Sequence, residues 1–244
     1  MLAVRGVATH VVTAGESGRT VVFLPGTNFS AATCLPPATA LCARARAVVA
    51  DLPGQPGLSS AERIPRGARL QWYGRWLTEL IDKISDEQVV VMGHSLGAAI
   101  APASDSPRVG RQVLVSPGGL TRLRLSPAVV NASAAWVLRR SPAVGAGLLR
   151  TMHGPDHTPR RMLVDWMTLV AKHVRTSTDP GKAPIGAPDV DRSVLVGDHD
   201  VFLPVRALAP AVRDTLGIEP HVVPSAGHLV IEEQPARLVS ACLG

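Results

Sequence analysis

The sequence predicts an α/β fold: a mostly parallel central sheet with flanking helices, and a helical cap inserted after the sixth strand. Short apolar runs alternate with longer segments of helical periodicity, which is the pattern of strand–helix–strand units. In the runs at 20–24, 47–50 and 88–92 every residue after Thr20 and Gln88 is apolar, as in strands covered on both faces. A chain of 244 residues fits one such domain and can bury a core without disulfides or a metal.

The expected elements follow one another in a regular order. Residues 4–14 alternate weakly and predict a strand pair or one long antiparallel edge strand. The clearest helix is 69–84, because its apolar residues recur every three or four positions. The other expected strands are 20–24, 47–50, 88–92, 112–116, 193–197 and 221–223, and the other expected helices are 30–43 with a break at Pro36-Pro37, a short one after residue 95, 128–138, 160–174, 205–216 and 234–243.

The long stretch between residues 116 and 193 interrupts this alternation with helix-favouring sequence that contains many Pro and Gly residues. We therefore expect residues 1–118 and 191–244 to form the core and residues 119–190 to form the cap. Open α/β sheets bind ligands at the carboxyl ends of their strands. The cap should cover that edge.

The charge distribution argues against a nucleic-acid partner. The net charge is +6, but residues 118–190 alone carry ten Lys/Arg against four Asp/Glu, and the rest of the chain carries 15 of each. A single-strand binder would add exposed aromatic residues, whereas this chain has one Tyr and three Phe. The excess of positive charge therefore belongs to the cap.

Composition also limits cofactors and location. The three cysteines are spaced neither as a metal site nor as a disulfide framework, so we expect reduced thiols, no metal and no cofactor. The first residues lack the apolar core of a signal peptide, and no apolar run approaches the ~18 residues of a membrane span. We expect a cytoplasmic protein that does not enter the membrane.

Residues 93–97, Gly-His-Ser-Leu-Gly, form the most informative stretch. They lie between an apolar strand and a small-residue helix, which is the strand–turn–helix context of a G-x-S-x-G nucleophile elbow. Gly93 and Gly97 leave room for a very tight corner, and the corner exposes the serine hydroxyl at the sheet edge. The pattern predicts that Ser95 is a nucleophile.

A serine hydroxyl needs a base, and the base needs an acid to orient it. His228 is the expected base, because it stands on the loop that directly follows the last expected strand; His94 should instead pack or hydrogen-bond beneath the corner. The acid should come from the loop after residue 197. Asp200 is favoured there and Asp198 is the alternative.

Attack on a carbonyl also requires N–H donors for the oxyanion. The backbone of Leu96, at the start of the short helix, is one expected donor. The other should come from the Gly26-Thr27-Asn28 turn, where we favour the Thr27 amide over that of Asn28.

These motifs together resemble the α/β-hydrolase superfamily. The resemblance rests on residues 93–97, on 51–59 (Asp-Leu-Pro-Gly-Gln-Pro-Gly-Leu-Ser), on Gly197-x-x-Asp200 and on Gly227-His228, in the family's order of serine, acid and histidine. It covers nearly the whole chain. The family commonly has His-Gly where this chain has Pro25-Gly26, and its D-x-x-G-x-G-x-S motif is one residue shorter than 51–59.

The resemblance implies acyl chemistry. The related dehalogenases and epoxide hydrolases have aspartate in place of Ser95, and the cap has no tyrosine to activate an epoxide. We expect a serine esterase or thioesterase that acts on a small-molecule ester or acyl substrate. A cyclase, lyase or acyltransferase on the same scaffold, and a non-catalytic receptor, are the alternatives.

Two further expectations concern the cap and its surroundings. Asn28 and cap residues should line the acyl pocket, with packing of the cap against the core as the alternative for each cap residue. The cap candidates are Trp136, Leu138, Met152, Trp166, Met167 and Leu169. Cap arginines are either a solvated face or a docking surface for an acidic acyl carrier or a carboxylated substrate; they are Arg122, Arg124, Arg139, Arg140, Arg160 and Arg161.

Overall fold

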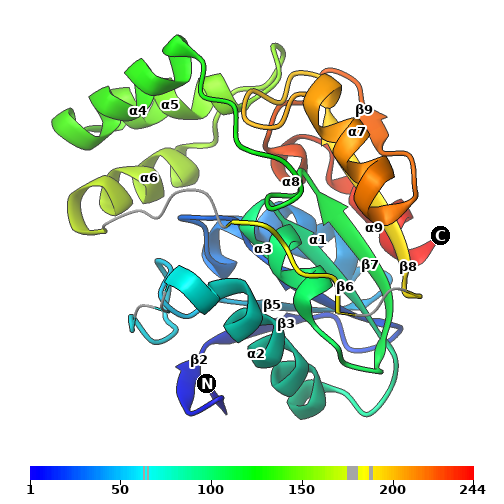
Figure 1. Ribbon diagram of the computed structural model, residues 1–244. Helices are drawn as coiled ribbons and strands as arrows, with labels where there is room; N and C mark the ends of the chain where they lie inside the picture. Colours follow the sequence, from blue (N-terminus) through cyan, green and yellow to red (C-terminus); the bar gives the residue numbers. More distant parts are fainter. Residues whose placement is uncertain (63, 65, 175–180, 187–188) are drawn as a thin grey trace.

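The computed structural model contains a twisted, mostly parallel sheet, and it describes residues 1–62, 64, 66–174, 181–186 and 189–244 (Figure 1). Within these residues seven strands pair in the order β3-β5-β4-β6-β7-β8-β9, and only β3 runs antiparallel to its neighbour. The predicted fold class is confirmed. The strands are β3 (Val11–Ala14), β4 (Thr20–Leu24), β5 (Arg46–Ala50), β6 (Val89–His94), β7 (Val109–Val115), β8 (Asp191–Gly197) and β9 (His221–Val223).

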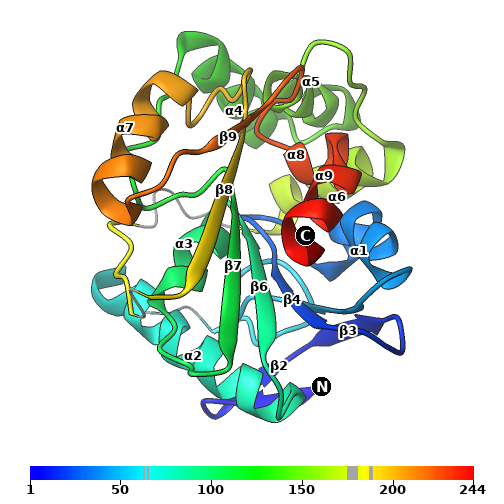
Figure 2. The same cartoon turned by 90° about the vertical axis from the view of Figure 1, so that its right-hand side faces the viewer.

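Helices cover both faces of this sheet, as Figure 2 shows. One face packs against α2, α3 and α7 and the other against α1, α8 and α9, so that two hydrophobic clusters lie on either side of the central strands. The covering helices are α1 (Leu35–Cys42), α2 (Arg69–Ile84), α3 (Leu96–Ile100), α7 (Val205–Leu216), α8 (Val230–Glu233) and α9 (Pro235–Leu243), with 3₁₀ turns at Ala31–Cys34, Arg66–Ala68 and Ala101–Ala103.

The N-terminal segment differs from the expected pair or single strand. It forms three strands, because β1 (Leu2–Val4) and β2 (Val7–Thr9) make a separate antiparallel ribbon before β3 joins the main sheet. The inserted helices consequently follow the seventh strand of the chain, not the sixth. The expected helix at 30–43 also divides, into a 3₁₀ turn and α1, and Pro36 and Pro37 occupy the first turn of α1, where a missing N–H costs little.

The insert between β7 and β8 contains α4 (Pro127–Arg139), α5 (Pro142–Met152) and α6 (Arg161–His173). These helices lie together above the carboxyl ends of the strands (Figures 1 and 2) and have their own cluster of buried apolar residues. Residues 175–180 and 187–188 of the expected cap lie outside the described residues. No helix in the described ranges is long and apolar enough to cross a membrane.

Candidate active site

Ser95 occupies the corner between β6 and α3 with φ 51° and ψ −104°, a conformation that a residue with a side chain rarely adopts. Two glycines make the corner possible. A Cβ on Gly93 would overlap the backbone of Gly97, and a Cβ on Gly97 would overlap the carbonyl of Leu24 at the end of β4. The Ser95 amide donates to the Val115 carbonyl of β7 at 2.9 Å, which fixes the corner to the sheet edge.

His228 and Asp200 lie in direct contact near this corner. Nδ1 of His228 is 2.9 Å from Oδ2 and 3.1 Å from Oδ1 of Asp200, and both side chains are buried. Oδ1 also accepts the amides of Phe202 and Leu203, each at 2.9 Å. The alternative acid, Asp198, instead accepts the Ala226 amide at 3.2 Å and is partly exposed.

The Asp200 carboxylate is stabilised in its charged form. Burial by itself would raise the pKa, but the neighbouring His228 and the Leu203 amide outweigh it and lower the pKa of Asp200 to about 2. A charged carboxylate at Nδ1 keeps the proton of His228 on that nitrogen. Nε2 is thereby left as the basic nitrogen.

The backbone around His228 is held by residues of α5 and α8. The His228 amide donates to the Met152 carbonyl at 2.7 Å, at the end of α5. The buried carboxylate of Glu233 accepts the amides of both Gly227, at 2.7 Å, and Gly154. The loop that carries His228 is therefore joined to the segment that follows α5.

His94 lies beneath the corner, as the sequence predicted. Its Nε2 is 2.9 Å from the His228 carbonyl, and its ring centroid is 5.0 Å from that of His228. Burial, and then the proximity of His228, lower the pKa of His94 to about 3. His94 is consequently neutral near pH 7, so Nε2 carries the proton and donates it to the His228 carbonyl.

The turn after β4 presents candidate oxyanion donors beside Ser95. A Cβ on Gly26 would lie 3.3 Å from Cβ of Ser95 and 2.7 Å from Nδ1 of His94. The Asn28 amide donates to Oε1 of Gln55 at 3.2 Å. This bond occupies the alternative donor, so Thr27 is the better candidate of the two.

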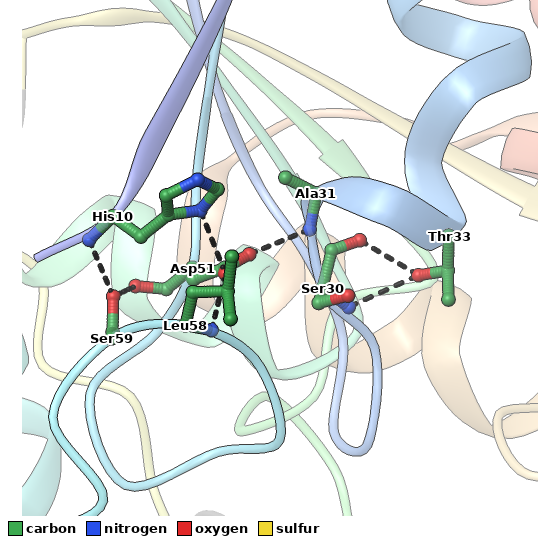
Figure 3. Close-up of polar contacts among 7 residues, drawn as sticks. All are labelled: His10, Ser30, Ala31, Thr33, Asp51, Leu58 and Ser59. Carbon is green, nitrogen blue, oxygen red and sulfur yellow. Dashed lines mark hydrogen bonds and ion pairs between the residues drawn. The ribbon is translucent and has the colours of Figure 1, made fainter. Parts of the chain in front are cut away.

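The buried side chain of Asp51 holds the far end of this turn (Figure 3). Its Oδ1 accepts the Ala31 amide at 2.6 Å, and its Oδ2 accepts the Leu58 amide at 2.8 Å and contacts Nδ1 of His10 at 3.0 Å. Ser59 also links Asp51, just after β5, to His10, just before β3, since its hydroxyl donates to the Asp51 carbonyl and accepts the His10 amide. The 51–59 stretch thus supports the turn through Asp51 and Gln55.

A cavity of about 430 Å³ lies between the sheet edge and α4–α6. Ser95, Leu96, His228 and Thr27 line it. Of the expected pocket residues it is also lined by Asn28, Trp136, Met152 and Met167. Among the described residues of its wall none is Asp, Glu, Lys or Arg, and its only ionisable side chains are those of His94 and His228.

Three expected pocket residues do not line this cavity. Leu138 and Leu169 point to solvent and are 80% and 53% exposed, because the inner faces of α4 and α6 are taken by other residues. Trp166 instead faces the turn after β4, and its indole Nε1 donates to the Asn28 carbonyl at 2.7 Å. The helix-favouring sequence of 160–174 predicted the helix that carries Trp166, but not this partner.

The basic residues of the insert also divide into two kinds. Arg160 forms a two-pronged ion pair with Glu232, at 2.7 and 2.8 Å, and this contact raises the pKa of its guanidinium. Arg160 thus joins α6 to α8 and is not a free surface charge. The other five expected arginines are exposed.

The parallel sheet with a strained serine corner at its edge and a buried histidine–aspartate pair beside it defines an α/β-hydrolase fold. The chain belongs to the alpha/beta hydrolase family, whose sequence model matches residues 21–241. Membership of this family supports a hydrolase.

The relatives found by sequence similarity carry no stated activity. Uncharacterized proteins of Mycobacterium tuberculosis and Mycobacterium bovis are 25% identical over 209 residues. The match covers 68% of this chain and 58% of the length of those proteins.

Solved structures share the fold across almost the whole chain. The naproxen esterase of Bacillus subtilis has a TM-score of 0.79 and 21% identity over 98% of this chain and 87% of its own. A second B. subtilis carboxylesterase has a TM-score of 0.75 and 20% identity, with 98% and 87% coverage. A meta-cleavage product hydrolase of Pseudomonas fluorescens has a TM-score of 0.73 and 19% identity, with 98% and 93% coverage.

The buried, neutral His94 predicts a loss of stability in acid. In the unfolded chain its pKa returns to about 6.5, so below that pH the unfolded state binds a proton that the folded state rejects. Stability should therefore fall as the pH falls from about 6.5 toward 3, by about 3 kcal/mol between pH 6.5 and pH 4. His94→Gln, which keeps an N–H donor but cannot be protonated, should remove most of this slope.

Urea unfolding at pH 7, 6, 5 and 4 measures the effect, and His221→Gln serves as the control because His221 is exposed on β9. Equal pH slopes for His94→Gln and the unmodified protein would contradict a buried, neutral His94.

Proposed function

We propose that the protein is a serine esterase in which Ser95 is the nucleophile, His228 the base and Asp200 the acid that orients the base. One observation carries this proposal: the strained Ser95 and the imidazole of His228 border the same cavity, while Nδ1 of His228 contacts the buried Asp200 carboxylate. A corner that costs free energy and exposes a hydroxyl to a cavity is a feature of nucleophiles.

The proposed reaction has two halves. Oγ of Ser95 attacks the ester carbonyl while its proton passes to Nε2 of His228, and the amides of Leu96 and Thr27 stabilise the oxyanion. His228 then returns the proton to the departing alcohol, which leaves an acyl-enzyme. In the second half His228 takes a proton from water, the hydroxide attacks the acyl carbonyl, and the free acid is released as Ser95 recovers its proton.

The cavity wall favours uncharged acyl groups. The described residues of this wall include no Lys or Arg, so a carboxylate that entered the cavity would lose its hydration and gain no charged partner there, which is costly. Apolar side chains such as Trp136, Leu148 and Met167 offer contact to a hydrocarbon or aryl group instead. We therefore infer that the acyl portion of the substrate is neutral and apolar.

An acidic acyl carrier is a second proposal, and it concerns delivery of the acyl group rather than the cavity. Leu123 and Leu125 line the cavity, while Arg122 and Arg124 of the same short segment are exposed. A carrier could place its charges on these arginines and its acyl chain inside. Arg160 is unsuited to this role because it is paired with Glu232.

Ser95→Ala should abolish covalent labelling by a fluorophosphonate and reduce kcat for a p-nitrophenyl ester by at least about a thousandfold. Asp200→Asn should reduce kcat by about 10² to 10⁴, because the histidine loses its orienting charge. Asp198→Asn is the matched control and should leave kcat within about twofold, since Asp198 does not contact His228. Full activity in Ser95→Ala would refute the triad, and labelling without turnover would favour a non-hydrolytic acyl enzyme.

A pair of esters with equal acyl length tests the uncharged cavity. The kcat/KM for p-nitrophenyl hexanoate should exceed that for mono-p-nitrophenyl adipate by about a hundredfold, because the adipate monoester brings an unpaired carboxylate into the cavity. Comparable values for the two esters would show that the cavity accommodates a charge.

Reversal of two charges tests the carrier. The Arg122→Glu/Arg124→Glu double variant should raise KM for an acyl group on an acidic carrier protein by about tenfold and leave KM for p-nitrophenyl hexanoate unchanged. Arg237→Glu, on α9, is the control. Equal changes for both substrates would remove the carrier from consideration.

A further inference from the structure

The turn that carries Thr27 is not held by its own sequence alone. Asn28 has φ 66°, in the left-handed region, which asparagine adopts more readily than most residues with a side chain. Other segments nevertheless contact this turn and support it. Part of that support comes from α6, a helix that lies far along the chain from the turn.

Two peptide groups fix the direction of the Thr27 N–H. The Gly26 carbonyl accepts the Phe29 amide at 3.1 Å. In a trans peptide the C=O and N–H point in opposite directions, so the N–H of the Gly26–Thr27 peptide points away from that bond. The Thr27 N–H direction therefore depends on where the Phe29 amide lies.

The peptide group between Asn28 and Phe29, the second after the Gly26–Thr27 peptide, is held at both of its ends. Its N–H makes the bond to Gly26 just described, and its carbonyl accepts Nε1–H of Trp166 at 2.7 Å. A rotation of this peptide would break both bonds together. The indole of Trp166 thus acts on Thr27 through one intervening peptide.

Packing reinforces the hydrogen bond. Phe29 is 2% exposed and belongs to the hydrophobic cluster of the inserted helices, and Trp166 packs against the same cluster. The indole of Trp136 donates to the Met167 carbonyl at 2.9 Å, which ties α4 to the turn of α6 that presents Trp166. The helix that carries Trp166 is itself held in place.

We propose that Trp166 is a positioning residue that orients the Thr27 amide toward the oxyanion. The position of α6 against the turn then determines how well the oxyanion is stabilised. This inference rests on the proposed esterase reaction. Trp166 does not line the cavity, so its effect reaches the substrate only through the backbone of the turn.

Trp166→Phe tests this role because it keeps an aromatic ring and removes the N–H donor. We expect kcat for p-nitrophenyl hexanoate to fall about tenfold with KM within about twofold, a smaller loss than deletion of an oxyanion donor itself. Affinity for a hexyl trifluoromethyl ketone should fall by the same factor, because its adduct with serine carries the oxyanion. Affinity for 1-hexanol, which is uncharged and forms no adduct, should not change.

The control is Trp72→Phe, the same substitution on α2 at a partly exposed tryptophan that contacts Arg5. Its kcat should match that of the unmodified protein. If Trp166→Phe does not fold, incorporation of benzothienylalanine at position 166 replaces only the N–H by sulfur and should give the same loss of kcat.

The outcomes separate this inference from the esterase proposal. Retained activity in Ser95→Ala overturns the esterase reaction. An inactive Ser95→Ala together with an unchanged kcat for Trp166→Phe overturns only the role of Trp166. A rise in KM alone, or a lowered melting temperature with unchanged kcat and ketone affinity, also overturns it, because these results indicate substrate binding or mere stability.

Discussion

The close crossing of the β6–α3 corner over the end of β4 is the constraint on which the other features depend. Gly93 and Gly97 allow backbone to contact backbone there, and any side chain at either position would push α3 away from the sheet. The corner confines Ser95 to an unfavourable backbone conformation. It also brings the Gly26 turn, the start of α3 and His94 within contact distance of one another.

Around that corner, groups from distant parts of the chain support the proposed catalytic residues. His228 is contacted through its ring by Asp200, through its carbonyl by His94 and through its amide by Met152. The turn after β4 is contacted by Asp51 and Gln55 from one side and by α6 from the other. The inserted helices therefore form the wall of the cavity and also hold the backbone of the turn after β4 and of His228 in place.

Patterns local to the sequence predicted most of the fold. The periodicity of 69–84 predicted α2, and both α2 and the helix expected at 205–216, α7, have the predicted bounds. The apolar runs predicted the parallel strands. The N-terminal strands were less well predicted, because a weak alternation does not reveal where a short ribbon turns. α5 was not predicted as a separate helix, since its Gly and Ala residues give little periodicity.

The site was predictable where one motif determines one position. The serine corner and the histidine–aspartate contact follow from residues that end strands, and their roles stay predictions. The contacts of Trp166, Glu233 and the Met152 carbonyl could not be predicted, because each depends on how separate segments meet in space. Asp51 had a visible signal, as the first residue of the 51–59 stretch, although its hydrogen-bond partners did not.

The bonds between the inserted helices and the sheet edge bear on how such a protein could diversify. A transplanted insert from a relative could supply a cavity of the desired shape and still yield an inert enzyme. It would have to reproduce a carbonyl at the position of Met152, a glycine amide opposite Glu233 and a donor at the position of Trp166. Recombination at the apparent boundaries of the insert would preserve the shape of the pocket but separate these partners, so new specificities on this scaffold are more accessible by substitutions along the cavity wall.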